Sequence, residues 1–504
     1  MSDANRTKVS YVPETTLGTT PATPAWKSLR VTGTSLSFKP LTTTSNELVS
    51  DRQFTDLVRV GQEVGGGVDA EFSWTNLDQP LETAFFNAWV QTPYRSNNGT
   101  ADSIITDVTS TVATFTNPAA EATGQGTLAV GHLVTTSGFG VAGNNVNAIR
   151  ITAASATTAT ITGFASEAVV PAAARIKVVG LEGAASDLSI TLASSVFYLN
   201  SAAPLNFATL GIVPGMWIKL GGAAVGTQFA TAANNDWVRV ASTVSAGVVS
   251  LDRTPTSFAA DSGTSKTIRV WFGDYLRNGT TKKSISIEQQ YADLVAPEYD
   301  TLAGMVADTF DLTADTQSIK TASLMFVGMS ATNSTSRFAG STDVSTTPGY
   351  DYLGTVPRAG DVFNTSSNVA RIAENGTAIT TNYVQSFSLN LTNSLRRQNA
   401  VGTLASIGIG AGRCAVTGSL KTYYFSNGIR TKILAGTATA LDVRLADPDG
   451  VRYVHIDLPR VKFSDGTPEG IVVDSDRTLT ASYQALKDPT LGYTIQLQRY
   501  EQIA

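Results

Sequence analysis

Short runs of alternating apolar and polar residues recur along this chain of 504 residues. The segments "VDAEFSW" (68–74), "SISIEQQ" (284–290) and "SFSLNLT" (386–392) follow the period of two that is typical of a strand with one covered face. Turn-forming residues separate these runs, and the chain has 43 glycines. The pattern predicts a mainly β protein made of many short strands.

One segment has the helical period instead, "NLDQPLETAFFNAWV" (76–90). Asp78 is placed to cap this helix and Pro80 suits its first turn. A shorter counterpart, "SNGIRTKILAG", spans 426–436. The apolar face of the longer helix consists of Leu81, Ala84, Phe85, Ala88 and Trp89.

The chain contains a degenerate repeat. Residues 34–74, moved by 351 positions without gaps, align with 385–425 and place glycines on glycines, Gly67 on Gly418 among them. Matching glycines indicate matching backbone needs. The alignment sets the chain's single cysteine, Cys414, against Glu63, so the thiol is not shared by the two copies. We therefore expect Cys414 to be a partly buried strand residue with no chemical role. The alignment also sets Leu420 and Thr422 against Asp69 and Glu71.

The repeat predicts two tandem β-sandwich domains, each with a flanking α-helix. Between the parts of the first domain lies an insert with its own repeat, in which Asn144-Asn145 parallels Asn234-Asn235. We expect this insert to be two small β-modules, because it consists of short strands separated by turns. The predicted boundaries are an N-terminal arm at 1–28, a first domain at 29–96 and 281–345, the insert at 97–280, and a second domain at 346–504.

Composition excludes several functions. The net charge of −5 disfavours tight binding of nucleic acid, because such binding needs a basic surface. A single cysteine rules out an internal disulfide. With only two histidines, His132 and His455, a histidine metal site or a Ser-His-Asp catalytic triad is not expected. Asp69 and Glu71 lie two apart on one strand face, yet acidic pairs on exposed strands are common. We therefore expect no enzyme, catalytic residue, metal or cofactor.

The first residues have no apolar signal core, and no run of about 18 apolar residues predicts a membrane span. We expect synthesis in a cytoplasm.

Several segments together resemble the tail tube (major tail) proteins of long-tailed bacteriophages. They are "YVPETTLGTTPATPAW", "ELVSDRQFTDL", "GGGVDAEFSW" with the helix after it, "IDLPRVKFS" and "ALKDPTLGYTIQLQRYE". The resemblance covers the chain outside the insert. It implies a virion protein whose β-sandwiches assemble into stacked rings, with inner sheets forming one barrel around the lumen that conducts the genome.

The resemblance also implies partners: other copies of the chain, tail terminator, tape measure and baseplate proteins, and double-stranded DNA that passes without specific binding. Family rings usually have six subunits, so two tube domains per chain favour three chains per ring, with six chains as the alternative. The insert should face outward, since the lumen must stay open.

From the strand faces we expect a polar, acidic lumen wall with Asp69, Glu71 and Glu288 as candidate lining residues. Ring stacking is assigned to the N-terminal arm (Tyr11 and Trp26), to the loop at 42–57 (Asp51 and Arg52), and to the C-terminal tail. A competing hypothesis is a surface adhesin or S-layer-like protein made of tandem β-domains, which the doubled insert would suit.

Overall fold

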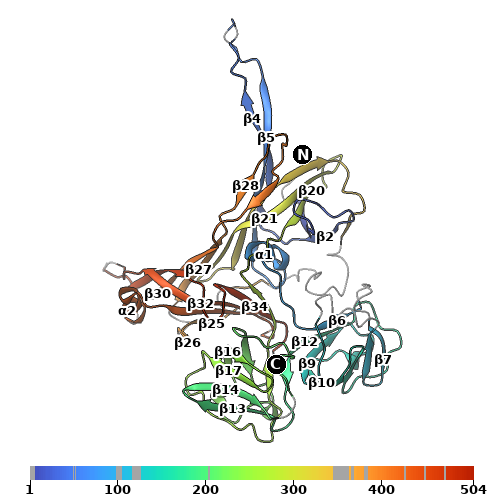
Figure 1. The fold of residues 1–504 in the computed structure, drawn as a ribbon, viewed down its shortest axis with the longest axis vertical. Helices are drawn as coiled ribbons and strands as arrows, with labels where there is room; N and C mark the ends of the chain where they lie inside the picture. The colour runs from blue at the N-terminus through green and yellow to red at the C-terminus, as the bar shows by residue number, and fades with distance from the viewer. Residues whose placement is uncertain are drawn as a thin grey trace.

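The structure is a computed structural model. It describes residues 6–48, 50–51, 53–97, 105–115, 126–202, 205–343, 362–364, 368–379, 384–424, 427–447, 450–469 and 473–503. These residues are mainly β, with two α-helices, and nearly all strands belong to sheets of 19 and 13 strands. The larger strand system extends from a long projecting hairpin into the body, and the smaller one lies at the opposite end of the molecule (Figure 1). Among the described helices, none is long and apolar enough to cross a membrane.

The two repeats have the same strand order. All pairings are antiparallel, and each repeat forms a four-stranded ladder. In the first repeat the order is β4 (Ser37–Thr44), β5 (Leu57–Glu71), β22 (Thr321–Gly328), β21 (Glu298–Asp315). In the second it is β27 (Val384–Thr392), β30 (Ala415–Tyr423), β33 (Thr478–Ala485), β32 (Tyr453–Asp465).

Local irregularities repeat as well. The β21·β22 ladder shifts register between Ala307 and Thr309, and the β32·β33 ladder shifts between Phe463 and Asp465. Helices α1 (Asp78–Phe85) and α2 (Gly428–Ala435) each end in a left-handed cap. Bulges are specific backbone features rather than consequences of composition. The predicted fold of two tandem sandwich-plus-helix units is therefore confirmed.

The ungapped alignment is wrong by two positions between β4 and β27, where Phe38 corresponds to Leu391, and by one position between β5 and β30. It matches Val68 with Ser419, but Val68 is buried and its buried counterpart on β30 is Leu420. A shift of one residue moves every side chain of a strand to the other face. Glycine register alone could not fix the strand's face, because glycines carry no side chain that must be buried.

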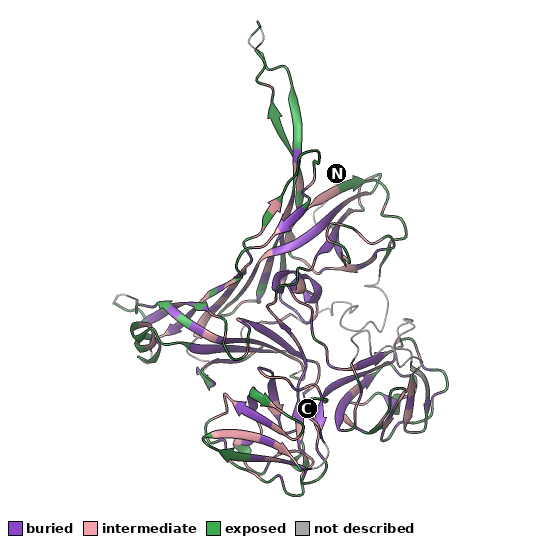
Figure 2. Ribbon diagram, viewed as in Figure 1, coloured by how far each residue is buried: buried purple, intermediate pink, exposed green. Residues whose placement is uncertain are grey.

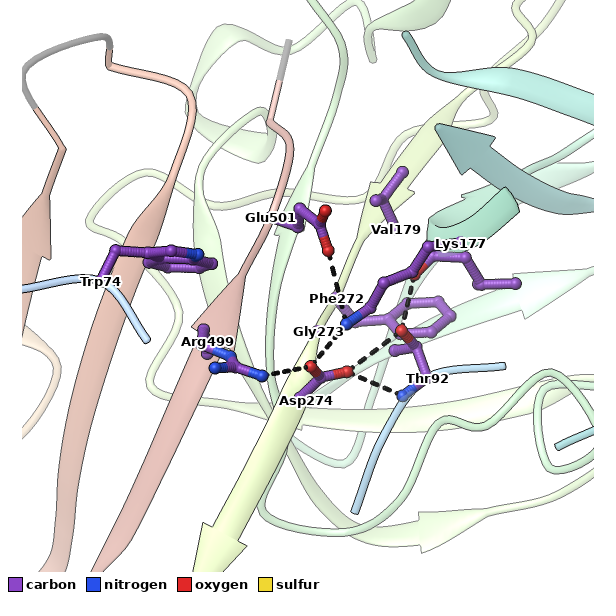
Figure 3. A pocket seen from close by; sticks show the side chains of 10 residues that line it. Trp74, Thr92, Lys177, Val179, Phe272, Gly273, Asp274, Arg499 and Glu501 are labelled. Atoms are coloured by element: carbon purple, nitrogen blue, oxygen red, sulfur yellow. Dashed lines mark hydrogen bonds and ion pairs between the residues drawn. The ribbon is translucent and has the colours of Figure 1, made fainter. Parts of the chain in front are cut away.

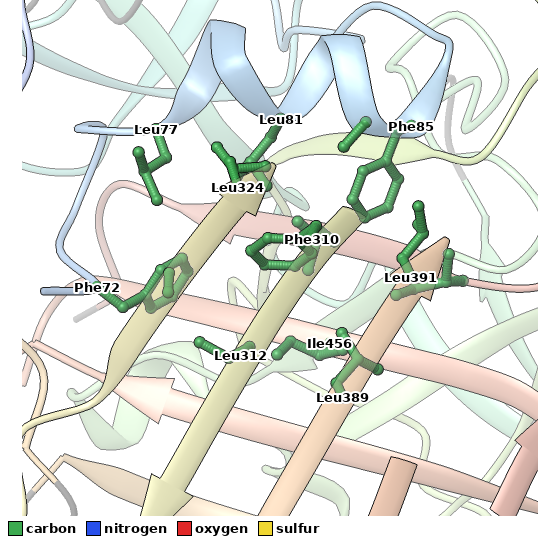
Figure 4. Packing of buried hydrophobic residues seen from close by; sticks show 14 of the residues in the cluster. Phe72, Leu77, Leu81, Phe85, Phe310, Leu312, Leu324, Leu389, Leu391 and Ile456 are labelled. Carbon is green, nitrogen blue, oxygen red and sulfur yellow. The ribbon is translucent and has the colours of Figure 1, made fainter. Parts of the chain in front are cut away.

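Helix α1 covers the core of the first repeat. Leu81 and Phe85 point from the helix onto strands β22 and β21, where Phe85 lies 6.3 Å from Phe310 between ring centroids (Figure 4). The helix is shorter than predicted. It ends at Phe85 because Phe86 is left-handed (φ 53°), and Asp78 provides no side-chain cap. Trp89 is still buried, but beyond the helix.

The N-terminal segment does not form a free arm. Strand β1 (Thr7–Pro13) pairs along its whole length with β20 (Ile285–Tyr291), so its backbone is part of the sheet. Strand β2 (Ala25–Ser28) pairs with β1, and Trp26 is fully buried with its indole N–H donating to Ser341 Oγ at 3.0 Å. Two apolar segments flank the proline-rich stretch, and burial of their aromatic side chains fixes the segment on its own chain.

The remaining strands of the larger system lie around these ladders, and β28 and β29 form a separate two-stranded hairpin. These strands of the larger system are β3 (Gly33–Thr34), β19 (Asp274–Arg277), β23 (Ser330–Ser334), β24 (Thr342–Asp343), β25 (Val369–Glu374), β26 (Thr377–Ala378), β31 (Thr439–Ala446) and β34 (Gln496–Tyr500). The separate hairpin consists of β28 (Arg396–Gln398) and β29 (Gly408–Gly410).

The smaller sheet consists of two modules with identical pairing order, which meet where β12 pairs with β18. Strand β6 (Tyr94–Ser96) joins at β12. The first module has the order β7 (Ile105–Thr109), β8 (Val112–Phe115), β11 (Thr158–Ile161), β10 (Ile149–Ala154), β9 (His132–Ser137), β12 (Arg175–Glu182). The second has the order β13 (Leu188–Ala193), β14 (Val196–Ser201), β17 (Val248–Asp252), β16 (Trp237–Val244), β15 (Trp217–Leu220), β18 (Arg269–Trp271).

The paired asparagines make equivalent contacts in the two modules. Asn144 and Asn234 are fully buried in short 3-10 helices, η3 (Ala142–Asn144) and η5 (Ala232–Asn234). The side-chain amide of Asn144 makes two hydrogen bonds with the backbone of Ala165, and that of Asn234 makes the same two bonds with Ala259. Each amide thus satisfies backbone groups of a neighbouring loop. A third 3-10 helix, η4, spans Val225–Thr227.

Candidate tube interface

The two repeats are joined edge to edge within one chain. Strand β21, the last of the first ladder, pairs with β27, the first of the second ladder, from Thr309 opposite Thr392 to Asp315 opposite Ser386. We call this pairing the β21·β27 junction. Because it is antiparallel like its neighbours, it merges the two ladders into one continuous sheet.

One face of this continuous sheet is apolar and covered, and the other is polar. On β27, Phe387, Leu389 and Leu391 are buried, while Ser388 and Asn390 on the other face are partly exposed. The alternation predicted for 386–392 is therefore present. The alternation predicted for 68–74 holds as far as Phe72, but Ser73, which was expected on the polar face, is buried. We call the second surface the polar face.

Acidic groups of the first repeat lie on the polar face. Asp69 on β5 is exposed and stands opposite Ser323, which stands opposite Asp311 on β21. Asp311 then faces Asn390 across the junction, and the Asn390 amide donates to its carboxylate at 2.5 Å. Glu71 is partly exposed on the same face. Sequence reasoning missed Asp311, although the alternation in "FDLTAD" (310–315) was available to find it.

The second repeat presents other residues than expected. Leu420 and Thr422, which the alignment matched with Asp69 and Glu71, are buried at 1% and 2% exposure. The outward positions on β30 are Ser419 and Lys421, and Lys421 lies 3.3 Å from Glu469. The one-residue error in the alignment causes this correction.

Glu288 does not line the polar face. It is 1% exposed on β20, a strand that is covered on both sides, and its carboxylate pairs with Arg337 at 2.8 Å. The alternation in 284–290 predicted an exposed polar face, but the structure covers that face as well. Ser286 on it is also fully buried, and its hydroxyl donates a hydrogen bond to Glu14. Polar residues on a strand predict an exposed face only where no other segment covers them.

The predicted stacking residues separate into two groups. Tyr11 and Trp26 are buried in their own chain, at 5% and 0% exposure, so they offer no surface to a second ring. Asp51 lies at the tip of the hairpin of β4 and β5, where it is exposed and accepts from the Gln53 backbone N–H at 3.3 Å. Arg52 lies outside the described residues.

The distal part of this hairpin projects from the body and is exposed along its length (Figures 1 and 2). We call residues 41–60 the hairpin arm. Among the described residues of the arm, the exposed apolar side chains are Leu41 (44%), Leu48 (101%), Phe54 (81%), Leu57 (60%), Val58 (45%) and Val60 (54%). Apolar side chains gathered on a protruding element typically mark a protein interaction surface.

A largely buried ion-pair cluster connects the insert to both repeats, and Figure 3 shows Lys177, Asp274, Arg499 and Glu501 of this cluster. Asp274 is on β19, a strand that falls within the predicted insert but pairs with β34 in the larger sheet. It pairs with Lys177 of the insert at 2.6 Å and with Arg499 of the second repeat at 3.0 Å. Arg499 also pairs with Asp78 of α1. Glu501 adds an ion pair with Arg175 at 2.7 Å. We call these six residues the ion-pair cluster.

Burial and the neighbouring cations set opposite pKa shifts in this cluster. For Asp78, burial raises the pKa to about 6, and Arg499 offsets only part of that effect. For Asp274, burial acts in the same direction, but Lys177 and Arg499 outweigh it and bring the pKa down to about 2. Arg175 and Lys177 likewise outweigh burial at Glu501 and lower its pKa to about 2.

Aromatic packing reinforces the same contact. The Trp237 ring of the insert meets Tyr500 of the second repeat edge-on, with ring centroids 4.7 Å apart. The Tyr500 hydroxyl donates to the Trp217 backbone carbonyl at 2.8 Å. The insert is thus held against the C-terminal strand rather than attached only through its connections.

Cys414 is exposed and directly precedes β30, whereas a partly buried strand residue was expected. Desolvation by nearby protein atoms raises the pKa of its thiol to about 11, so the reactive thiolate is scarce at neutral pH.

Taken together, a duplicated β-sandwich, a continuous sheet with one polar face and a protruding apolar hairpin define a structural protein built for self-association. Comparison with protein families identifies which one: the model of the phage tail tube protein family matches residues 4–213 and again 202–485. The chain belongs to this family.

The two family matches meet within the insert, so they do not coincide with the division of the chain by strand pairing. A comparison with curated proteins found no match. Family membership makes the chain a structural, non-enzymatic component of the virion tail, and it replaces the adhesin or S-layer hypothesis.

Proposed function

We propose that this chain builds the tail tube as stacked rings of three chains, each chain supplying two of six tube domains around the lumen. The observation that carries this proposal is the β21·β27 junction. It brings two tube domains of one chain into the edge-to-edge pairing that neighbouring domains of a closed ring need. Six chains per ring is the alternative.

The polar face is our candidate for the lumen wall. Asp69, Glu71 and Asp311 place negative charge on the first repeat, whereas in the second repeat the lysines Lys421 and Lys462 are accompanied by the carboxylates Glu469 and Asp465. In a ring of three chains, acidic sectors would alternate with sectors in which lysines and carboxylates balance each other. Acidic sectors repel phosphates, and small polar groups between them offer DNA no continuous basic track. Double-stranded DNA would then pass without specific binding.

We assign ring stacking to the hairpin arm, which includes Asp51, rather than to Tyr11 and Trp26. Its exposed apolar side chains gain from being covered by the next ring. The ends of the stack would meet the tail terminator and baseplate proteins, and the tape measure protein would occupy the lumen before DNA does. The insert, which lies at the end of the molecule away from the hairpin arm (Figure 1), would lie on the outside of the wall, because the lumen must stay open for DNA.

Cryo-electron microscopy of tubes assembled from the purified chain tests this proposal. We expect threefold symmetry for whole chains, pseudo-sixfold symmetry for the inner sheet and density for the insert outside the wall. Sixfold symmetry for whole chains would overturn the trimer. A lumen lined by the covered apolar face, or by the insert, would overturn the assignment of the polar face.

A further inference from the structure

Each chain has two strand edges that match the two sides of its own β21·β27 junction. Strand β4 pairs only with β5 in the described part of the chain, although its counterpart β27 has strands on both sides. Strand β32 pairs with β33 over Val461–Asp465, but beyond Val461 no strand of the described chain pairs with its other edge, where its counterpart β21 binds β27. One edge of each kind therefore remains open.

The repeated pairings define which residues correspond. The register shift at Ala307 and Thr309 on β21 matches the shift at Phe463 and Asp465 on β32, so Thr309 corresponds to Asp465. An isolated bridge between Pro468 and Leu479 extends the match, because it corresponds to Leu312 opposite Ala322.

The other side of the junction follows in the same way. In the first repeat Phe38 pairs with Val64, and in the second Leu391 pairs with Val416. All but Phe38 are fully buried, and Phe38 packs against the same core. Thr392, the residue after Leu391, therefore corresponds to Lys39.

We propose that chains join by repeating the β21·β27 junction between molecules. The end of β32 in one chain pairs with β4 of a second copy, so that Asp465 stands opposite Lys39 of that copy, as Thr309 stands opposite Thr392 within the chain. The inference rests on the proposed ring and specifies its chain-to-chain contact.

Charge supports this register. The internal pair is neutral, Thr309 with Thr392, whereas the corresponding open positions carry opposite charges on exposed side chains. Lys39 already lies opposite Glu63 on its own β5, so the new contact would place it between two carboxylates. Opposite charges directly across a ladder stabilise it, and like charges destabilise it.

The two helices provide independent support. Helix α1 lies beside the internal junction and is almost entirely buried, partly because Asn393 of the second repeat donates to the Ala84 carbonyl at 2.8 Å. Helix α2 lies beside the open edge, and of its residues only Ile429 is buried, while Leu434 is 79% exposed (Figure 2). A second copy at this edge would cover α2 as the second repeat covers α1.

Pro468 defines the end of the contact. It corresponds to Leu312 and has no N–H, so the ladder loses a hydrogen bond where the internal junction has Leu312 opposite Leu389. Proline at an open edge also discourages indiscriminate strand addition. We therefore expect a shorter ladder between chains than within one.

Disulfide trapping tests the register. In a Cys414→Ser background, Lys39→Cys with Asp465→Cys should link chains on mild oxidation, giving a covalent trimer on non-reducing gels. Opposite residues that do not share hydrogen bonds bring their Cβ atoms near the disulfide range. Thr309→Cys with Thr392→Cys is the matched internal control and should close within one chain. Lys39→Cys with Lys462→Cys is the out-of-register control and should not link chains.

Each outcome decides between the alternatives. Tubes that assemble without the 39–465 link, or with a 39–462 link in its place, overturn the proposed register but leave the proposed ring intact. Wild-type chains that form no rings at all overturn the proposed function itself. If the cysteine pair blocks assembly, charge reversal decides: Lys39→Glu should reduce the assembled fraction severalfold, and adding Asp465→Lys should restore it. Failure of that rescue counts against the register.

Discussion

At the scale of single residues, Asp274 joins three parts of the chain. Its carboxylate binds Lys177 of the insert, Arg499 of the second repeat, and the backbone N–H of Thr92 at 2.8 Å. Lys177 and Asp274 are both nearly inaccessible, so neither charge has water as an alternative partner. A buried charge that loses its partner is costly, and this makes the cluster sensitive to single changes.

We expect Asp274→Asn to lower the free energy of unfolding by about 3–5 kcal/mol, because Lys177 and Arg499 would lose a buried counter-ion. Chemical denaturation followed by tryptophan fluorescence measures the effect. Glu63→Gln is the control, since it removes a partly exposed ion pair with Arg397 and should cost less than about 1 kcal/mol. Equal effects of the two substitutions would contradict a stabilising role for the cluster.

The same cluster predicts how stability depends on pH. Asp274 and Glu501 have pKa values of about 2 in the folded chain, below their ordinary values of 3.8 and 4.5. Their stabilisation is therefore present above the ordinary values and is lost as pH falls towards about 2. Asp78 has the opposite sign: its pKa of about 6 exceeds 3.8, so its contribution is present at low pH and is lost as pH rises through about 6.

We accordingly expect the Tm to fall as pH drops below about 4, because Asp274 and Glu501 lose their stabilisation there, whereas the gain at Asp78 is already nearly complete at its ordinary pKa of 3.8. Thermal denaturation at pH 7, 5 and 3 measures this, and Asp274→Asn should show a smaller fall than wild type. If the Tm of Asp274→Asn falls as steeply with pH as that of wild type, the acid sensitivity comes from other carboxylates.

At the scale of elements, the hairpin arm differs most between the two repeats. In the second repeat the equivalent connection is the short hairpin of β28 and β29, which lies against the base of the arm: the Gln62 backbone N–H donates to the Leu404 carbonyl at 3.0 Å. The arm itself extends beyond any such support. One chain therefore carries one long and one short connection, and only the long one reaches far from the body.

Phe54→Asp should leave folding and ring formation unchanged but shorten or abolish tubes, because a charge on the exposed arm opposes its burial by the next ring. Negative-stain microscopy measures tube length, and the Tm checks folding. Leu192→Asp in the insert, also at an exposed apolar position, is the matched control and should assemble normally. Full-length tubes from Phe54→Asp would remove the arm from the stacking contact.

The elements also show how far sequence reasoning reaches. Alternation found the faces of β5 and β27, because each pattern is local and one side of each strand is buried. It failed for β20, where Glu288 finds Arg337 across 49 positions, and for β1 and β2, whose aromatic side chains are covered by segments remote in the sequence. The ion-pair cluster was missed for the same reason: Lys177, Asp274 and Arg499 converge only through the tertiary fold. No local sequence pattern predicts such contacts.

At the scale of the whole molecule, the β21·β27 junction has a consequence for concentration. In any ring built from this chain, every second contact between tube domains lies within one polypeptide. Two domains on one chain meet at an effective concentration that reaches about the millimolar range, whatever the number of free chains. The covalent link also fixes the order in which the two kinds of domain follow each other. Half of each ring is thus correctly ordered before any two chains meet, and dilution can weaken only the other half.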